Sequence, residues 1–307
     1  MARVAFIKYF WMEKLGLMYI SAMLKKSGHQ TLVCMNNRNQ IRQRLAVFKP
    51  DIVGFYCVSG KQKWIQNTAN FIKEEISKNI LVVVGGPHPT FSPELIEKGG
   101  IDIICQGEGE YPMLDLANRI DAKEDITGIR NLWVKVDKMI FRNPMRPLVQ
   151  DIDEFSFPDR ELYKDYRYIY DSPYYHFLTS RGCSYSCAFC YNDAFRSMQE
   201  PGLNYVRRRS VDNAIQELAY CKRRYRFSSV VFLDDDFGLA EKDWLYPFLD
   251  RYKKEIGLGF FCETRADLLN EEFVRKLKDS GCHWVEVGVE SGNEKHRNAL
   301  LKKNLKV

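Results

Sequence analysis

Short apolar runs alternate with amphipathic helical segments twice along this chain, and that alternation restricts the folds open to it. The first series fills residues 1–118 and opens with the apolar run from Val4 to Ile7. Continuous apolar runs of this length are typical of strands buried on both faces of a parallel sheet. The first series therefore predicts a doubly wound α/β sheet, in which ligands bind at the carboxyl ends of the strands.

The strands and helices of the first series follow from the same pattern. We expect strands at residues 4–7, 31–34, 51–56, 80–84 and 102–105, and helices at 15–26, 41–48 and 64–76. A further helix is expected from Ser92-Pro93-Glu94, because a serine cap, a proline and an acidic residue favour a helix N-terminus. Glycine-rich loops, Gly85-Gly86 and residues 107–110, follow two of these strands. They permit a ligand to approach the backbone, although ordinary turns would have the same composition.

A second series of longer βα units begins at Tyr174. Strands are expected at 175–179, 229–233, 259–264 and 284–289, with helices that begin after Ser210 and Asn270. Between the series lie an expected hairpin at 131–141 and a polar, proline-bounded connection at 147–158. We therefore expect an α/β domain in residues 1–130, a hairpin and linker in 131–172, and a partial (β/α) barrel in 173–307.

Three cysteines follow the first strand of the second series with the spacing C-x3-C-x2-C: Cys183, Cys187 and Cys190. Three thiolates at this spacing can bind three irons of a 4Fe–4S cluster, which usually takes four protein ligands. The fourth iron would stay open to an amine and a carboxylate. A zinc site is less well matched because no second cysteine pair accompanies the three. A disulfide with one free thiol and three core cysteines are the remaining alternatives.

Composition narrows the setting of this site. Hydrophobic residues make up 45% of the 307 residues and charged residues 28%, which predicts a packed core. No apolar run approaches the roughly 20 residues that span a bilayer. Nine cysteines without an export signal predict a reducing cytoplasm. The net charge is +6, and basic runs at 207–209 and 222–226 could contact nucleic acid, but solvated helix faces explain such runs more often.

The cysteine loop resembles the signature of radical S-adenosylmethionine (radical SAM) enzymes. The first series resembles the cobalamin-binding domain that precedes radical SAM domains in a family that includes anaerobic magnesium-protoporphyrin ester cyclase and C- and P-methyltransferases. Four segments carry this second resemblance in the same order: LGLMYI at 15–20, KPDIVG at 49–54, GGPHPT at 85–90 and GEGE at 107–110. The resemblance implies a cobalamin-binding α/β sheet followed by a radical SAM barrel.

The same resemblance implies three cofactors and the residues that bind them. Cys183, Cys187 and Cys190 would hold the 4Fe–4S cluster, while cobalamin would lie against Gly85, Gly86, Gly107, Glu108, Gly109 and Glu110. For SAM, it implies Asp234 and Asp235 at the ammonium, Arg265 at the carboxylate, Glu290 and Ser291 at the ribose, and Phe189 at the adenine. Two of these residues have a structural alternative: Asp235 as a turn cap and Arg265 as the ion-pair partner of Asp267. No catalytic residue can be singled out.

The first domain departs from the family pattern at one place. Cobalamin domains commonly carry D-x-H-x-x-G after the first strand, where the histidine binds cobalt. Here the loop from Lys8 to Lys14 has no histidine. His88, flanked by prolines, is a poor substitute, so cobalamin is expected to bind without a protein imidazole.

The implied activity is reductive cleavage of SAM to a 5′-deoxyadenosyl radical, followed by methyl transfer from cobalamin or by cyclisation. A small-molecule substrate and a reductant such as flavodoxin or ferredoxin are implied partners. One alternative is a methylthiotransferase acting on tRNA, which carries extra cluster cysteines; Cys34, Cys57 and Cys105 lie in expected strands and are interpreted as core. Another is an electron-transfer protein, which needs no SAM-binding carboxylates. Four βα units, where the family barrel usually has six, indicate the N-terminal portion of a longer chain.

Overall fold

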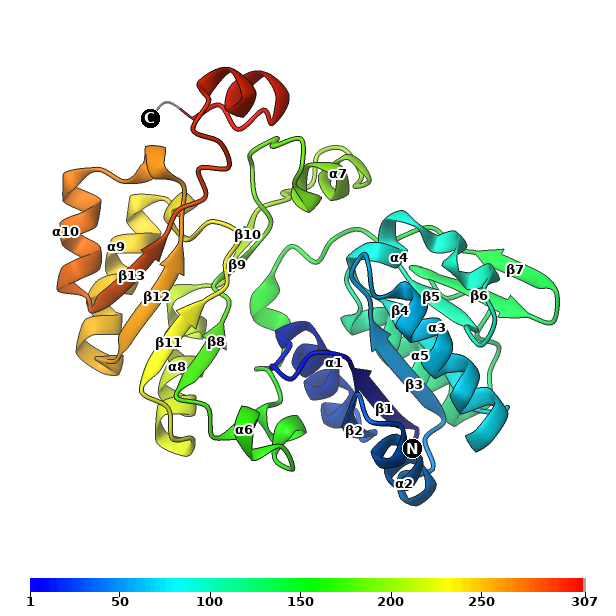
Figure 1. The fold of residues 1–307 in the computed structure, drawn as a ribbon. Coiled ribbons are helices and arrows are strands. Elements are labelled where there is room, and N and C mark those ends of the chain that lie inside the picture. The colour runs from blue at the N-terminus through cyan, green and yellow to red at the C-terminus, as the bar shows by residue number, and fades with distance from the viewer. Residues whose placement is uncertain (306–307) are drawn as a thin grey trace. The chain divides into compact units, whose positions relative to one another are not determined.

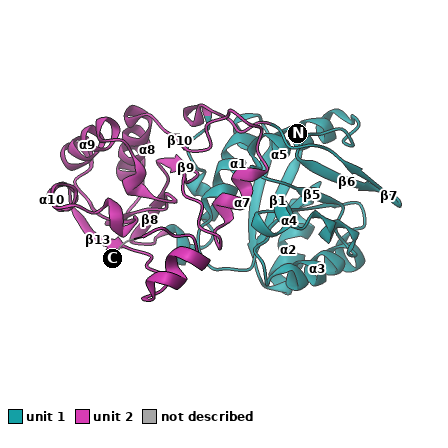
Figure 2. Ribbon diagram, turned by 90° about the horizontal axis from the view of Figure 1, so that it is seen from above, with its two compact units in different colours: residues 1–146, 155–170 teal, residues 147–154, 171–307 magenta. Residues whose placement is uncertain are grey.

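The computed structural model describes residues 1–305 and separates them into two compact units. Unit 1 comprises residues 1–146 and 155–170, and unit 2 comprises residues 147–154 and the chain from Asp171 onward (Figure 2). Each unit is built around its own sheet. Within residues 1–305, no helix has both the length and the apolar character that crossing a membrane requires.

Unit 1 contains a sheet in the order β2-β1-β3-β4-β5-β6-β7 (Figure 1). Its parallel strands are β1 (Arg3–Lys8), β2 (Gln30–Met35), β3 (Ile52–Tyr56), β4 (Leu81–Gly85) and β5 (Ile103–Cys105). The expected hairpin, β6 (Leu132–Val136) and β7 (Met139–Arg142), extends the sheet with antiparallel pairing. The helices are α1 (Leu15–Lys26), α2 (Arg38–Phe48), α3 (Gln62–Phe71), α4 (Pro87–Phe91), α5 (Glu110–Ala122) and α6 (Arg167–Tyr170).

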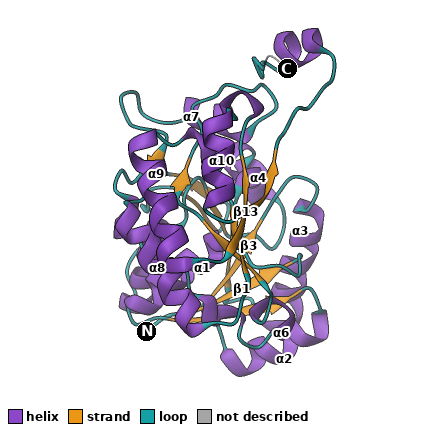
Figure 3. Ribbon diagram, turned by 90° about the vertical axis from the view of Figure 1, so that its left-hand side faces the viewer, coloured by secondary structure: helices purple, strands orange, loops and turns teal. Residues whose placement is uncertain are grey.

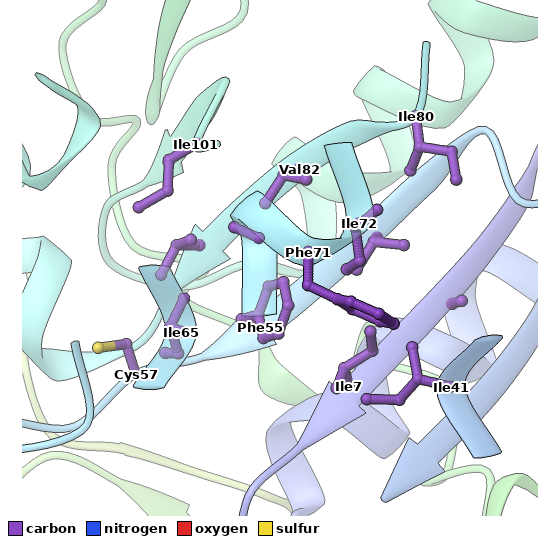
Figure 4. Packing of buried hydrophobic residues seen from close by; sticks show 14 of the residues in the cluster. Ile7, Ile41, Phe55, Cys57, Ile65, Phe71, Ile72, Ile80, Val82 and Ile101 are labelled. Carbon is purple, nitrogen blue, oxygen red and sulfur yellow. The ribbon is translucent and has the colours of Figure 1, made fainter. Parts of the chain in front are cut away.

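The core of unit 1 explains why these runs become strands. Figure 4 shows Ile7 of β1 and Phe55 of β3 near Phe71 and Ile72, which end α3 and begin the π-helical turn after it. All of these side chains are at most 3% exposed. Burying each such side chain stabilises the fold by about 1.5–3 kcal/mol. Since helices cover the strands on both faces, continuous apolar runs form parallel strands here, as the sequence predicts.

Unit 2 contains a fully parallel sheet in the order β13-β12-β11-β8. The strands are β8 (Tyr174–Phe177), β11 (Ser229–Phe232), β12 (Gly259–Glu263) and β13 (Cys282–Glu286), and a separate short pair joins β9 (Ser180–Arg181) to β10 (Arg207–Arg208). The helices are α7 (Tyr191–Ser197), α8 (Val211–Arg224), α9 (Lys242–Arg251) and α10 (Glu271–Asp279). Helices and strands alternate along unit 2, as expected for a partial barrel. Figure 3 distinguishes helices from strands by colour.

Helix ends in unit 2 follow the capping residues found in the sequence. The Ser210 hydroxyl accepts a hydrogen bond from the N–H of Asn213 at 3.1 Å, and the Asn270 side chain accepts one from Phe273 at 2.9 Å. Gly281 has a φ of +96° after the end of α10. Each cap satisfies a backbone group that the helix leaves without a partner.

One local expectation differs from the structure. The helix expected from Ser92 is a 3₁₀ turn, Pro93–Glu97, and the preceding turn is itself helical as α4. Gly86, with a φ of +105°, turns the chain after β4, and Pro87 then begins α4 at a position that suits its fixed φ. The chain therefore starts its helix at the glycine–proline step, five residues before the serine cap.

The basic run at 207–209 is part of the interior of unit 2. Arg207 and Arg209 are 4% and 5% exposed. Arg209 forms an ion pair with the buried Glu217, and the Arg208 guanidinium lies 4.8 Å from the ring centroid of Trp244. The run therefore stabilises the fold, and the expectation of a solvated helix face is wrong here: Arg207 and Arg208 form β10, and the run does not form a basic surface for nucleic acid.

Candidate active site

The cysteine loop begins at a glycine that no other residue could replace easily. Gly182 has a φ of +90°, and a Cβ there would collide with the carbonyl oxygen of Tyr205. Antiparallel pairing of β9 and β10 brings these segments together just before the cysteines. The pairing of β9 with β10 therefore fixes the start of the cysteine loop. Strands of two residues are too short to be recognised in the sequence.

The three cysteines lie on one loop that ends at the N-terminus of α7. Cys187 is buried, while Cys183 and Cys190 are partly exposed. The Cys190 N–H donates to the Cys187 carbonyl at 3.0 Å, and the Cys190 sulfur accepts a hydrogen bond from the N–H of Asn192 at 3.5 Å. Burial raises the pKa of Cys183 to about 11. For Cys187, burial raises the pKa and the nearby Arg265 and Lys303 oppose that rise.

The donor set on this loop, three cysteines within eight residues, is of the kind that binds an iron–sulfur cluster. Among residues 1–305, no three His, Cys, Asp or Glu side chains converge closely enough to hold one metal ion. A cubane imposes a different requirement, because each thiolate binds a different iron. Two partly exposed cysteines and one buried cysteine on a short loop fit that requirement.

Asp235 joins the two ends of the cysteine loop. Its carboxylate accepts hydrogen bonds from the Gly182 N–H and from the Asn192 side-chain amide, each at 2.9 Å. Asn192 in turn accepts a hydrogen bond from the Tyr205 hydroxyl at 2.8 Å. This arrangement is the capping alternative considered for Asp235, and its SAM-binding role remains a prediction.

Asp234 is enclosed by the end of β8. The Thr179 N–H donates to its carboxylate at 3.1 Å and the Thr179 hydroxyl at 2.6 Å, and the Ser180 hydroxyl donates to it as well. Burial raises the pKa of Asp234, and the two hydroxyls oppose that rise. Because its side chain is fully buried and already hydrogen-bonded, Asp234 holds the ends of β8 and β11 together.

Asp236 is a functional candidate that the sequence reasoning did not select. One carboxylate oxygen accepts a hydrogen bond from the Thr264 hydroxyl at 2.7 Å. The other, Oδ2, is buried and has no hydrogen-bond partner in the part of the chain that the structure describes. Burial raises the pKa of Asp236, while the Thr264 hydroxyl, the backbone N–H groups of Arg265 and Gly238 and the Arg265 charge lower it. A buried carboxylate oxygen without a partner is the kind of group that a cationic ligand would satisfy.

Arg265 contacts the cysteine loop, with part of its guanidinium already bound. Its Nε and Nη2 donate to the two carboxylate oxygens of Asp267 at 3.0 and 2.9 Å. The guanidinium carbon lies 3.8 Å from the ring centroid of Tyr185, and Nη1 lies 4.0 Å from the Cys187 sulfur. The pairing with Asp267 is the alternative that the sequence offered, and the contact with Cys187 was not expected.

The remaining predicted SAM residues lie beside the C-terminal segment. Glu290 has a φ of +66°, and its carboxylate forms an ion pair with the Lys303 ammonium at 3.0 Å. The Ser291 hydroxyl accepts a hydrogen bond from the Asn293 N–H at 3.1 Å. Phe189 is half exposed, and the Lys303 ammonium lies 5.9 Å from its ring centroid. Lys303 is a basic residue in a run of polar residues, and no feature of the sequence predicted its position beside Glu290 and Phe189.

In unit 1, the glycines predicted to face cobalamin have roles in the fold. A Cβ on Gly86 would lie 2.8 Å from the Cys57 carbonyl oxygen, and Gly85 pairs with the end of β5. Gly107, with a φ of +70°, donates its N–H to the Thr90 hydroxyl at 3.0 Å. The remaining residues, Glu108, Gly109 and Glu110, lead into α5, with Gly109 as the cap and Glu110 buried. Their contact with cobalamin remains a prediction.

The loop after β1 presents an apolar surface where the family pattern has a histidine. Tyr9, Phe10, Trp11 and Met12 are 36–53% exposed although they are large and hydrophobic. The Lys61 ammonium lies 4.0 Å from the ring centroid of Tyr9. An exposed aromatic loop at the carboxyl end of a parallel strand fits the flat, largely apolar body of a corrin ring. His88 contacts the Ser59 hydroxyl at 3.2 Å.

Comparison with known proteins matches both halves of the chain. A family model described as the B12 binding domain matches residues 8–117, and one described as the radical SAM superfamily matches residues 177–306. An uncharacterised methyltransferase of Pyrococcus horikoshii is 30% identical over 286 residues, which cover 91% of this chain and 61% of that protein. The anaerobic magnesium-protoporphyrin IX monomethyl ester cyclase of Rubrivivax gelatinosus is 24% identical, with 89% of this chain and 51% of the cyclase covered.

A solved structure supports the fold over almost the whole chain. The radical SAM methyltransferase TsrM from Kitasatospora setae superposes with a TM-score of 0.76 and 17% identity, covering 96% of this chain and 60% of TsrM. The expected fold of a cobalamin-binding-like sheet followed by a radical SAM barrel is confirmed. This chain spans between half and two thirds of the length of each of these proteins.

Proposed function

We propose that this chain, which belongs to the radical SAM superfamily and carries a B12-binding domain ahead of its radical SAM domain, is the cofactor-binding part of a methyltransferase. The methyl group that the enzyme transfers to its substrate would come from SAM by way of cobalamin. The observation that carries the proposal is the position of the cysteine loop. Three thiols lie on a loop braced by Asp235, and after the neighbouring strand lies a buried carboxylate oxygen of Asp236 that has no hydrogen-bond partner among residues 1–305.

Cys183, Cys187 and Cys190 would hold the 4Fe–4S cluster. When bound, the cluster supplies the electron for reductive cleavage of SAM. The thiols must lose their protons to become ligands, so cluster assembly releases protons. Asp235 would keep the loop in one conformation by binding Gly182 and Asn192. This brace acts on the loop and needs no contact with the cluster.

SAM would bind with its ammonium at the carboxylates that follow β11, where Asp236 joins the predicted Asp234 and Asp235. The Oδ2 of Asp236, which has no hydrogen-bond partner among residues 1–305, can accept the ammonium, while the Thr264 hydroxyl fixes the other oxygen. A charge-assisted hydrogen bond in a buried site is stronger than a neutral one. Glu290 and Ser291 remain our proposal for the ribose, and Phe189 for the adenine. The partly exposed ring of Phe189 leaves a face for stacking.

Cobalamin would bind to unit 1 at the carboxyl edge of its sheet. The exposed aromatic loop from Tyr9 to Met12 would contact the corrin, and the backbone near Gly107 would approach its periphery. When bound, cobalamin supplies a cobalt centre that can carry a methyl group. Since the loop after β1 has no histidine, no imidazole from this loop can bind the cobalt.

The partners follow from this chemistry. We propose a small-molecule substrate, a cytoplasmic setting, and a flavodoxin or ferredoxin as reductant. The burial of Arg207 and Arg209 weakens the case for tRNA as substrate. Cys34, Cys57 and Cys105, which a second cluster would require as ligands, are at most 3% exposed, and burial raises the pKa of Cys34 to about 11. These thiols favour a single cluster.

The test is SAM turnover by protein reconstituted anaerobically with iron, sulfide and cobalamin. With a strong reductant we expect SAM to yield 5′-deoxyadenosine, and a methyltransferase will also yield S-adenosylhomocysteine because the methyl group leaves SAM. A cyclase would yield 5′-deoxyadenosine alone. Protein with a full cluster that forms neither product would contradict the proposal. A variant with alanine at all three loop cysteines is the control for cluster-independent breakdown.

A further inference from the structure

The contact between Arg265 and Cys187 suggests a role for this arginine that differs from binding the SAM carboxylate. Arg265 follows β12 and is 7% exposed. Asp267 already occupies Nε and Nη2, so a second bidentate carboxylate would have to displace it. Only Nη1 remains, and it lies 4.0 Å from the Cys187 sulfur, at the long end of the range for a hydrogen bond to sulfur.

Three contacts hold the guanidinium in this orientation. Asp267 binds one edge, the Tyr185 ring lies against one face at 3.8 Å, and the Lys303 carbonyl accepts from Nη2 at 2.8 Å. Tyr185 belongs to the cysteine loop itself. The segment that carries Lys303 also binds this loop, because the Leu301 carbonyl accepts a hydrogen bond from Ala188 at 2.9 Å. The positive end of the Arg265–Asp267 pair therefore faces Cys187.

We propose that Arg265 is a positioning residue that keeps a positive N–H against the Cys187 sulfur and thereby raises the reduction potential of the cluster. The inference rests on the proposed function, since it requires a cluster on the three cysteines. Reduction adds negative charge to the cluster and its sulfurs. A cation and a hydrogen-bond donor stabilise the reduced form more than the oxidised form, and hydrogen bonds to sulfur are among the features that set such potentials.

Lys303 provides a second cation in the same region but is arranged differently. Like Arg265, it is paired with a carboxylate, since its ammonium is bound to Glu290, and it lies near the Phe189 ring. No hydrogen bond from the Lys303 ammonium to a cysteine sulfur is found within the described chain, residues 1–305. Arg265 is therefore the side chain to change.

The experiment is a redox titration of the reconstituted cluster in the absence of SAM. Electron paramagnetic resonance measures the amount of reduced cluster at each potential. We compare wild-type protein with Arg265→Gln, which removes the charge, and Arg265→Lys, which keeps the charge and loses the planar fork. Arg275→Gln is the matched control, because it removes the same charge from an exposed i,i+4 pair on α10. At a fixed potential, Arg265→Gln should lower the ratio of reduced to oxidised cluster by about tenfold, which is 59 mV for one electron. The ratio for Arg265→Lys should lie between those of Arg265→Gln and wild type, and the ratio for Arg275→Gln should equal that of wild type.

Each other outcome contradicts the inference. A full cluster with unchanged potential in Arg265→Gln would remove the tuning role, and a loss of SAM affinity without a potential shift would assign Arg265 to SAM. Loss of the cluster in both Arg265 variants would leave a purely structural role. Failure of the proposed function is distinguishable: wild-type protein that holds the cluster but does not cleave SAM would contradict the function and leave the potentials measurable.

Discussion

Individual residues in the cysteine loop divide into ligands and braces. Cys183, Cys187 and Cys190 are the predicted ligands, while Asp235 and Arg265 bind the loop that carries them. The same chain contains other buried cysteines, such as Cys221 on α8. Burial alone therefore does not distinguish a ligand from a core thiol, and the spacing on one loop does.

Alanine at all three loop cysteines should abolish iron binding. The expected result is loss of the cluster's iron, sulfide and visible absorbance after anaerobic reconstitution, because no thiolate remains at the loop. Cys221→Ala is the matched control, since it removes a buried thiol from the same unit, and it should retain the full iron content. Iron retained by the triple variant at the wild-type level would show that the cluster lies elsewhere.

Asp236→Asn should weaken SAM binding. A hydrogen bond to a charged group contributes about 1.5–3 kcal/mol, so the dissociation constant should rise roughly ten- to a hundredfold. Burial raises the pKa of Asp236, so wild-type affinity should be present above that pKa and fall as pH drops through it. Equilibrium dialysis with SAM and the cluster-loaded protein measures both effects. The exposed Asp212 provides the control Asp212→Asn, which should bind as wild type; equal affinity in Asp236→Asn would exclude Asp236.

At the scale of elements, the sequence predicts the long, regular parts well. The expected helix at 15–26 coincides with α1, and each expected parallel strand is present within a few residues of its expected ends. Their apolar runs and caps are local signals that tertiary contacts reinforce. The pairing of β9 with β10 was not predictable, because each strand has two residues and depends on a partner far along the chain.

The candidate site was also predictable only in part. The cysteine spacing identifies the loop, but it does not show which acid beside β11 keeps a free oxygen. Asp234, Asp235 and Asp236 are identical in type and adjacent in sequence. The structure separates them by their neighbours: Thr179 and Ser180 enclose the first, Gly182 and Asn192 bind the second, and only the third has a buried oxygen without a partner in residues 1–305.

The turn between β4 and α4 should tolerate no side chain at Gly86. A φ of +105° costs a β-branched residue about 1–2 kcal/mol, and the Cβ would lie 2.8 Å from the Cys57 carbonyl oxygen. Gly86→Val should therefore lower the free energy of unfolding by roughly 2 kcal/mol or more in urea denaturation of protein without cobalamin. Gly128→Ala is the control, because nothing lies within 4 Å of a Cβ there. A Gly86→Val protein of wild-type stability would show that the turn does not require glycine. Close approach of a ligand to the backbone would then be the better explanation for Gly86.

On the scale of the whole molecule, the chain passes between its two units more than once. Residues 147–154 belong to unit 2, although residues 155–170 return to unit 1. Asp153 contributes to this exchange, since its carboxylate accepts a hydrogen bond from the Ser210 N–H at 3.0 Å, at the start of α8. Each unit nevertheless has its own sheet and its own buried side chains.

Separate cores predict that the two cofactors stabilise different parts of the molecule. In scanning calorimetry of the intact chain, cobalamin should raise the transition of unit 1, and SAM added to cluster-loaded protein should raise that of unit 2. A ligand at a hundredfold excess over its dissociation constant stabilises its unit by about 2.7 kcal/mol, which corresponds to a shift of roughly 5–10 °C for units of this size. Asp236→Asn should reduce the SAM shift and leave the cobalamin shift unchanged. A single transition that either ligand raises would show that the units unfold together, because a ligand bound to one unit would then stabilise both.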